Sequence, residues 1–537
     1  MIRRRGRAAL AASLALVIVL VACAPAPENG DTVPEPTVVP LPASIEAIGG
    51  APFVLDDRVR IGGDPDAAAA LAALVEARTG LSVGASSSGG AGIELRVDRD
   101  GAAESYRITA DEASVIISGA DAAGLFYGVQ TFGQLVARDG DRWVVPAVEI
   151  DDAPRFAYRG VMLDVARHFF PVETVKAYID RAASLKFNAL HLHLSDDQGW
   201  RLQLDSRPEL TEKASDTEIG GGDGGFFTKD DYREIVAYAA SRHLIVVPEL
   251  DMPSHTHAVG LAYPELAEDP VITDAVRETV VQFHGALPKK GEPYEGLAVG
   301  FSSLKIHDEA TYDFVADVFG ELAAMTPGPY LHFGGDEAHG TAPEDFAEFV
   351  ERTSRIIADL GKTPIAWHEA GAAPDLSDET IGQYWGYTTP TDGMDDKARA
   401  FVANGSKVIL APADAAYLDM KYDAGTALGL QWANGPTSVR RAYSWEPGGL
   451  IEGIGDDEIL GVEAPLWSET LRTASDIDAM AFPRIAAIAE AGWSPATGTN
   501  HERTWRSFRE RVGRLGPLWT SLGIGFTAAD GIVWVTE

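Results

Sequence analysis

Residues 158–194 read YRGVMLDVARHFFPVETVKAYIDRAASLKFNALHLHL, and this stretch is the strongest indication of the fold. Two short apolar runs, 158–164 and 188–194, enclose a segment with helical periodicity that begins at Pro171. Proline is favoured in the first turn of a helix, and apolar side chains three or four residues apart form one buried face. That face contains Val172, Val175, Tyr178, Ile179, Ala182 and Leu185. A strand–helix–strand unit of this kind predicts parallel strands joined by a crossover helix.

The same alternation continues toward the C-terminus. Six further strand-like runs follow: LIVVPEL (244–250), YLHFGG (330–335), PIAWH (364–368), TIGQYW (380–385), KVILAP (407–412) and ILGVEAPLW (459–467). Eight such runs over roughly 350 residues predict a (β/α)8 barrel with long loops. An open, doubly wound parallel sheet is the alternative.

The rest of the chain predicts a second, smaller domain. A length of 537 residues exceeds what one ordinary core accommodates. Residues 43–152 mix strand and helix patterns and predict a small α+β domain, whereas residues 153–537 form the barrel with a C-terminal helical extension. In the small domain we expect strands at 53–61, 92–98, 105–110 and 114–119, and helices at 66–80 and 121–136.

The composition restricts the possible partners. Hydrophobic residues make up 46% of the chain and charged residues 23%, as in ordinary soluble globular proteins. The formal net charge is −36, which argues against binding to nucleic acid and against docking on anionic lipid.

The N-terminus resembles a bacterial lipoprotein signal. Four arginines near the start precede a short apolar run, 8–22, which ends at Cys23, the only cysteine of the chain. Residues 1–22 are therefore expected to be a signal peptide and residues 23–42 a Pro-rich tether. We expect an exported protein that is held on the cell membrane, facing outside, only through an acylated Cys23. An ordinary secretory signal with an incidental cysteine is the alternative.

Polar and aromatic residues follow the predicted strands, where a parallel barrel carries its active site. Aromatic faces stack on the apolar face of a sugar ring, and carboxylates and arginine bind its hydroxyls, so this set indicates a sugar substrate. The set comprises Arg167, Asp196, Asp197, His255, Asp336, Glu337, Trp367, Trp385, Tyr417, Asp419, Trp467 and Glu469.

The adjacent carboxylates of Asp336 and Glu337 suggest an unusual glycosidase. Most glycosidases place two carboxyl groups on opposite sides of the scissile bond, ~5–5.5 Å apart for retention and ~6.5–9.5 Å apart for inversion. Neighbouring residues are poorly placed for that arrangement. A substrate that supplies its own nucleophile would leave one acid for the leaving group and free the other for a different role.

Several ordered motifs resemble glycoside hydrolase family 20, the β-N-acetylhexosaminidases. The resemblance covers most of residues 37–510, with Ser254 where the family usually has glycine. It implies removal of terminal β-linked N-acetylglucosamine or N-acetylgalactosamine, without a cofactor or metal. The motifs are LDVARHFF (163–170), LHLHLSDDQGWR (190–201), VPELDMPSH (247–255), HFGGDE (332–337), AWHE (366–369), QYW (383–385), YLD (417–419) and LWSE (466–469).

The resemblance implies five catalytic residues. Glu337 would be the general acid and base at the glycosidic oxygen. Asp336 would orient the 2-acetamido group, whose oxygen attacks the anomeric carbon and gives an oxazolinium intermediate. Tyr417 would hydrogen-bond that oxygen, and Asp196 and His255 would form a relay toward Glu337.

The resemblance also implies six substrate-binding residues and a class of partner. Chitin fragments, peptidoglycan pieces and glycoconjugates that end in N-acetylhexosamine all remain possible substrates. The 3- and 4-hydroxyls would be bound by Arg167, the 4- and 6-hydroxyls by Asp419 and Glu469, and the acetamido methyl and the sugar face by Trp367, Trp385 and Trp467.

Two other functions fit parts of the sequence. His191 and His193 lie on one strand face and could be metal ligands of a barrel metallohydrolase, completed by His255 and Asp336. The aromatic rim has no use in such a site, so we expect His191, His193 and His332 to be buried barrel residues. A lipid-anchored glycan-binding protein without catalysis is the second alternative, but binding alone does not need a general acid.

Overall fold

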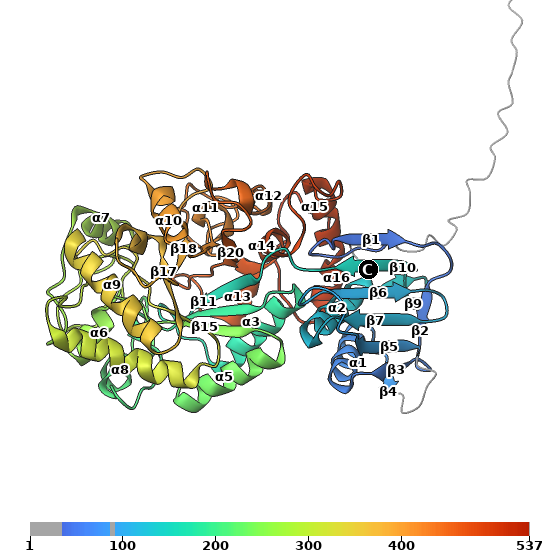
Figure 1. Cartoon of the computed structure of the whole chain (residues 1–537), viewed down its shortest axis with the longest axis horizontal. Coiled ribbons are helices and arrows are strands. Elements are labelled where there is room, and N and C mark those ends of the chain that lie inside the picture. The colour runs from blue at the N-terminus through green and yellow to red at the C-terminus, as the bar shows by residue number, and fades with distance from the viewer. Residues whose placement is uncertain (1–34, 86–91, 536–537) are drawn as a thin grey trace, which may run out of the picture.

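The computed structural model describes residues 35–85 and 92–535, and its larger domain is a closed parallel barrel (Figure 1). The predicted barrel is confirmed with all eight expected runs as strands, and the open sheet is wrong because the last strand pairs with the first. The strands are β11 (Tyr158–Asp164), β12 (Ala189–His193), β15 (Ile245–Glu249), β16 (Tyr330–His332), β17 (Thr363–Trp367), β18 (Ile381–Tyr384), β19 (Val408–Leu410) and β20 (Ile459–Ala464).

Helices cover the outside of the barrel (Figure 1). The helix α3 (Val172–Ser184) begins after Pro171, as predicted, and buries Val175, Tyr178 and Ile179. The other helices of nine or more residues in this domain are α5 (Lys229–Ser241), α7 (Asp274–Gln282), α8 (Glu309–Met325), α9 (Pro343–Asp359), α10 (Met394–Ala403), α14 (Arg484–Trp493) and α15 (Trp505–Arg514).

Shorter elements fill the long loops. A two-stranded hairpin, β13 (Ser195–Asp196) with β14 (Gly199–Trp200), follows β12 at the C-terminal rim and carries Asp196. The short helices are α4 (Glu209–Lys213), α6 (His257–Ala262), α11 (Ala413–Ala416), α12 (Val439–Tyr443), α13 (Ala474–Ala481) and α16 (Gly516–Ser521), with 3-10 turns at His368–Ala372 and Pro447–Gly449.

In its described residues, the small domain contains two sheets and two helices. A seven-stranded sheet has the order β1-β10-β6-β7-β5-β3-β4, and a three-stranded sheet has the order β2-β9-β8. Its elements are β1 (Ser44–Ala47), β2 (Phe53–Leu55), β3 (Arg60–Gly63), α1 (Pro65–Thr79), β4 (Gly84–Ala85), β5 (Ile93–Val97), β6 (Tyr106–Ala110), β7 (Val115–Gly119), α2 (Ala122–Leu135), β8 (Ala137–Asp139), β9 (Arg142–Val145) and β10 (Val148–Asp152).

The prediction of one strand over 53–61 is wrong, because the chain turns in the middle of this run. The Val59 amide donates to the Asp56 carbonyl at 3.2 Å, and the Arg58 amide donates to the Asp56 carboxylate at 2.9 Å. The two halves, β2 and β3, therefore join different sheets.

A buried polar cluster joins the two domains. Lys186, fully buried after α3, donates to the hydroxyl of Tyr106 at 2.8 Å and to the carboxylate of Asp152 at 3.2 Å. The indole of Trp493 donates to the same carboxylate at 2.9 Å. The contact between the domains therefore contains a fully buried ion pair, Lys186 with Asp152, whose two charges come from different domains.

The expected tether enters this packed region. Val38, Val39 and Leu41 are buried, so the packed chain begins before residue 43. The Leu41 amide donates to Glu490 of α14 at 3.0 Å. The signal segment, Cys23 and the first part of the tether lie outside the described residues. Within the described part of the chain, no helix has the length and apolar character needed to cross a membrane.

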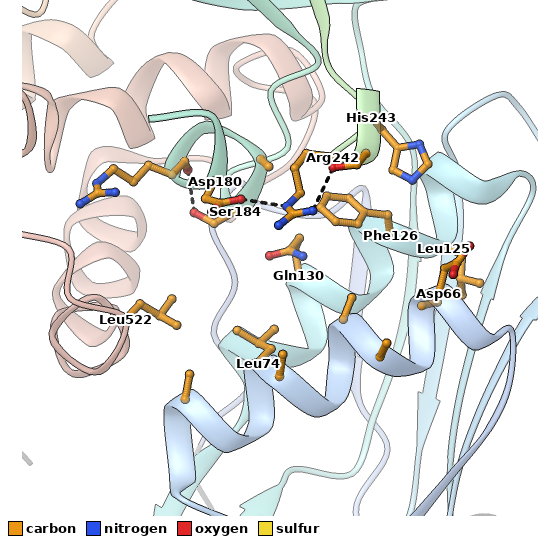
Figure 2. Close-up of a pocket in the computed structure, with 18 of the residues that line it drawn as sticks. Asp66, Leu74, Leu125, Phe126, Gln130, Asp180, Ser184, Arg242, His243 and Leu522 are labelled. Carbon is orange, nitrogen blue, oxygen red and sulfur yellow. Dashed lines mark hydrogen bonds and ion pairs between the residues drawn. The ribbon is translucent and has the colours of Figure 1, made fainter. Parts of the chain in front are cut away.

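A cavity lies between the domains (Figure 2), and its volume is about 910 Å³. It is lined by α1 and α2 of the small domain, by α3 and α5 of the barrel, and by Leu522 and Ile524 near the C-terminus. Its edge includes the ion pair of Arg242 with Asp180 at 2.8 Å. None of the predicted site residues lines this cavity, so its size does not mark the active site.

Candidate active site

The chain makes a tight turn immediately after β16, where the two adjacent acids lie. Gly334 and Gly335 have φ of +71° and +95°, and a Cβ on Gly334 would lie 1.7 Å from the Asp251 carboxylate. Glycine is therefore required at position 334 both for its backbone conformation and for the close approach. Glu337 also has a positive φ, +47°, which non-glycine residues adopt chiefly where the surroundings enforce it.

This turn brings both acids to one histidine. The Nε2 atom of His255 lies 3.5 Å from Oε2 of Glu337 and 3.7 Å from Oδ2 of Asp336. His255 itself has φ of +56°, and the hydroxyl of Ser254 donates to the Glu337 carbonyl at 3.4 Å. Serine at position 254 thus ties the loop of His255 to the backbone of Glu337.

Asp196 lies behind His255, as the predicted relay requires. Its carboxylate is 3.1 Å from Nδ1 of His255, 2.8 Å from Nε2 of His193 and 2.7 Å from the guanidinium of Arg167. Burial opposes ionisation of Asp196, but Arg167 and His255 outweigh it and hold the pKa of Asp196 well below its usual range. Burial likewise disfavours the His255 cation, yet Asp196 and Asp336 raise the pKa of His255 well above its usual value. Asp196 and His255 therefore form a pair of an anion and a cation.

Four aromatic side chains form a wall beside these acids. The rings of Trp367 and Trp467 are 6.0 Å apart, and those of Tyr417 and Trp467 are 6.2 Å apart. The indole of Trp385 donates to the carboxylate of Glu369 at 3.0 Å. Trp367, Trp385, Tyr417 and Trp467 belong to one hydrophobic cluster, so the structure brings these four predicted residues together.

Several predicted residues have buried polar atoms that form no hydrogen bond with other described residues. Such atoms are rare in folded proteins, and a group of them around one space indicates a polar ligand. These atoms without a hydrogen bond are Nη1 of Arg167, Nε2 of His255, Oδ1 of Asp336, Oδ2 of Asp419 and Oε2 of Glu469. For one of these residues, Glu469, burial and the neighbouring Asp164 raise the pKa to about 7, whereas Arg167 opposes this.

The structure adds four residues that the sequence reasoning missed. Asp251 accepts from the amide of Gly335 at 3.0 Å, just before Asp336, and Glu369 accepts from the indole of Trp385. Trp432 is 45% exposed and lies edge-on to Trp385 and Tyr417. Glu249 contacts Trp367 from inside the barrel. Glu249 ends β15 and Asp251 follows two residues later, and their place in the quoted motif VPELDMPSH was the available signal.

The metallohydrolase reading is wrong, because the four proposed ligands do not share a site. Both nitrogens of His191 face the carboxylates of Glu249 and Glu463, at 3.0 and 2.9 Å. His255 and Asp336 meet at the rim, whereas His191 and His332 meet around Glu249 inside the barrel. His191, His193 and His332 are fully buried, as predicted.

Comparisons with known proteins give consistent matches over nearly the whole chain. The family model "Glycosyl hydrolase family 20, catalytic domain" matches residues 156–345 and 340–496, and the model for domain 2 of the same family matches residues 35–153. A β-N-acetylhexosaminidase of Cellulomonas fimi is 40% identical over 518 residues, covering 94% of this chain and 98% of that one.

Solved structures give the same result. A structure described as a glycoside hydrolase family 20 β-N-acetylglucosaminidase is 70% identical with a TM-score of 0.86, and covers 94% of this chain and 100% of its own. The N-acetyl-β-hexosaminidase of Streptomyces plicatus in complex with Thio-NAglucal is 44% identical with a TM-score of 0.84, over 93% of this chain and 97% of its own.

Proposed function

The chain belongs to glycosyl hydrolase family 20, and on that premise we propose that it is an exo-acting, retaining β-N-acetylhexosaminidase with substrate-assisted catalysis. The observation that carries the proposal is the meeting of Asp336 and Glu337 at one imidazole nitrogen of His255, beside an aromatic wall. Two carboxylates on the same side of the site are suited to one leaving group and one neighbouring acetamido group, not to opposite faces of a bond.

In the first half of the reaction, Glu337 donates its proton to the glycosidic oxygen as the bond to the anomeric carbon breaks. The acetamido oxygen of the substrate attacks that carbon, and the electron pair of the broken bond leaves with the protonated aglycone. Asp336 accepts the acetamido N–H and stabilises the positive charge of the oxazolinium. The hydroxyl of Tyr417 donates to the acetamido oxygen and aligns it.

In the second half, Glu337 acts as a base. It takes a proton from a water molecule whose oxygen attacks the anomeric carbon, and the bond to the acetamido oxygen breaks. Two displacements at the same carbon give net retention of the β-configuration. Asp196 and His255 keep the carboxylate of Glu337 in place through both steps.

The remaining residues fix the sugar. Trp367, Trp385 and Trp467 enclose the acetamido methyl, because an apolar wall accommodates a methyl group better than it does water. The hydroxyls of the ring would satisfy the buried polar atoms of Arg167, Asp419 and Glu469. An N-acetylhexosamine at the non-reducing end of a glycan has both the acetamido group and these hydroxyls.

The activity is tested with a panel of chromogenic β-linked sugars. We expect hydrolysis of N-acetyl-β-glucosaminide and N-acetyl-β-galactosaminide, and at least about 100-fold lower kcat/KM for the β-glucoside, which lacks the participating acetamido group. Proton NMR should detect the β-anomer of the released sugar first. An enzyme that hydrolyses glucoside and N-acetylglucosaminide equally would contradict the mechanism, and binding without hydrolysis would favour a glycan-binding protein.

We also propose that the protein is exported and anchored to the outer face of the cell membrane by lipid on Cys23. The support is the basic start, the short apolar run and the position of Cys23 at the end of that run. Metabolic labelling with a fatty-acid probe should mark the wild type and leave Cys23→Ser unmarked. An unlabelled wild type would rule out the anchor.

A further inference from the structure

Glu249, the last residue of β15, connects the aromatic wall to the inside of the barrel. Its side chain is fully buried, and its two oxygens have different partners. Oε1 accepts from the indole nitrogen of Trp367 at 2.8 Å, whereas Oε2 faces Nε2 of His191 at 3.0 Å and also contacts Nδ1 of His193. The Glu249 carboxylate therefore contacts both Trp367 of the aromatic wall and His193, which in turn contacts Asp196 of the relay.

His193 lies between two carboxylates. Its Nδ1 faces Glu249 and its Nε2 faces Asp196 at 2.8 Å. A neutral imidazole has one N–H and cannot donate to both, so His193 is an imidazolium. In agreement, burial opposes the cation but Glu249 and Asp196 raise the pKa of His193 to about 9.

The same pairing extends away from the site. His191 faces Glu249 with one nitrogen and Glu463 of β20 with the other, at 3.0 and 2.9 Å. Burial opposes its charge, yet Glu463 and Glu249 raise its pKa to about 10. The charges therefore alternate through the barrel in the order Glu463, His191, Glu249, His193 and Asp196, and the last of these contacts His255.

We propose that Glu249 is a positioning residue, which through His193 fixes Asp196 and the relay to Glu337, and through its other oxygen fixes Trp367. This inference rests on the proposed hexosaminidase function. Without the Glu249 carboxylate, His193 loses one of its two counter-charges. A glutamine at this position has a single amide oxygen, so it can accept from Trp367 or from the histidines but not from both sides. Glu337 and the aromatic wall would then both shift relative to the anomeric carbon of the substrate.

Glu463 provides a matched control. It is equally buried and also pairs with His191, but its other partners are the hydroxyl of Tyr158 at 2.5 Å and the amide of Gln383 at 2.6 Å. Neither Tyr158 nor Gln383 has a hydrogen bond to the relay or to the aromatic wall, and His191 meets the wall only through its ring, 5.9 Å from that of Trp367. Replacing Glu463 thus removes a buried charge of the same kind without disturbing the site directly.

The experiment compares Glu249→Gln with Glu463→Gln in the full chain, with the chromogenic N-acetyl-β-glucosaminide. We expect Glu249→Gln to lower kcat/KM by about 10- to 100-fold, and Glu463→Gln to stay within about threefold of the wild type, at similar thermal stability of the two variants. Equal activity of the two variants at equal stability would overturn the proposal. Inactive wild type would instead reject the proposed function.

The pH profile separates positioning from general destabilisation. The charged or titratable groups around Glu249 are His191, His193, His332 and Asp251, and His193 also faces Asp196, which Arg167 shares. With Glu249 neutral, His193 loses its proton at lower pH, so the alkaline limb of kcat/KM should move to lower pH in Glu249→Gln. A profile that is scaled down without moving would contradict the proposed role.

A second pair keeps the test decisive if Glu249→Gln does not fold. His193→Gln and His191→Gln each remove one buried imidazolium, but only His193 contacts Asp196. We expect the loss of kcat/KM and the shift of the alkaline limb in His193→Gln alone. Equal losses in both histidine variants would overturn the proposal.

Discussion

Glu337→Gln is expected to lower kcat on alkyl and sugar aglycones by about 10²- to 10⁴-fold, because a glutamine cannot protonate the glycosidic oxygen. The substitution preserves the size of the side chain, and glutamine adopts the positive φ of residue 337 at the same cost as glutamate. The folded structure should therefore persist. Steady-state kinetics with an N-acetylglucosamine disaccharide measures the loss.

Substrates whose aglycones differ in acidity provide the control for this variant. A nitrophenolate leaves without protonation, so the first step of Glu337→Gln should be partly rescued with nitrophenyl substrates. Turnover then stalls at the second step, where no base activates water, and a burst of nitrophenol should precede slow turnover. Equal losses for every leaving group would contradict the role of Glu337 as the acid.

A thiazoline analogue of the intermediate is expected to bind at least about 10²-fold more tightly than N-acetylglucosamine itself. The reason is that the ring and the developing charge of the oxazolinium resemble the transition state more closely than the product does. Burial and the charge of Glu337 raise the pKa of Asp336 in the free site, whereas His255 opposes them. A cationic ligand next to Asp336 favours its ionised form, so thiazoline affinity should depend on this residue.

Asp336→Asn tests that dependence. The amide keeps the shape of the side chain but has no negative charge, so we expect kcat to fall by about 10²- to 10³-fold and the affinity advantage of the thiazoline over N-acetylglucosamine to shrink. Isothermal titration of both ligands measures the second effect without turnover. An unchanged affinity ratio in Asp336→Asn, or no inhibition of the wild type, would count against participation of the acetamido group.

The sequence predicts the barrel well because each strand is a short apolar run with a helical segment after it. The same pattern predicts where the site lies, since side chains such as Asp336 and Trp467 follow their strands directly. The sequence also predicts the tight turn at Gly334 and Gly335, because two glycines directly before two acids indicate such a turn.

The residues missed by sequence reasoning have their roles through contacts between distant segments. Glu249 reads as one more position of a buried strand until Trp367, 118 residues away, is placed against it. Trp385 is likewise contacted by two residues from other segments. The carboxylate of Glu369 accepts from its indole, and the ring of Trp432 lies edge-on to it. In the small domain, strands such as β8 are too short for a periodic signal, and the turn at Asp56 divides a run whose composition is uniformly strand-like.

The buried contact of Lys186 with Asp152 has a consequence for anyone who shortens this chain. A barrel cut free at residue 153 would lose Asp152 and Tyr106, and would expose Lys186 together with the indole of Trp493, which packs in the hydrophobic core of the small domain. The ammonium group would then be hydrated, but apolar surface around Trp493 would face water, which lowers stability and favours aggregation. The small domain carries none of the proposed catalytic residues, yet we expect the barrel alone to be less stable than the full chain, because part of its surface is packed in the core of its neighbour.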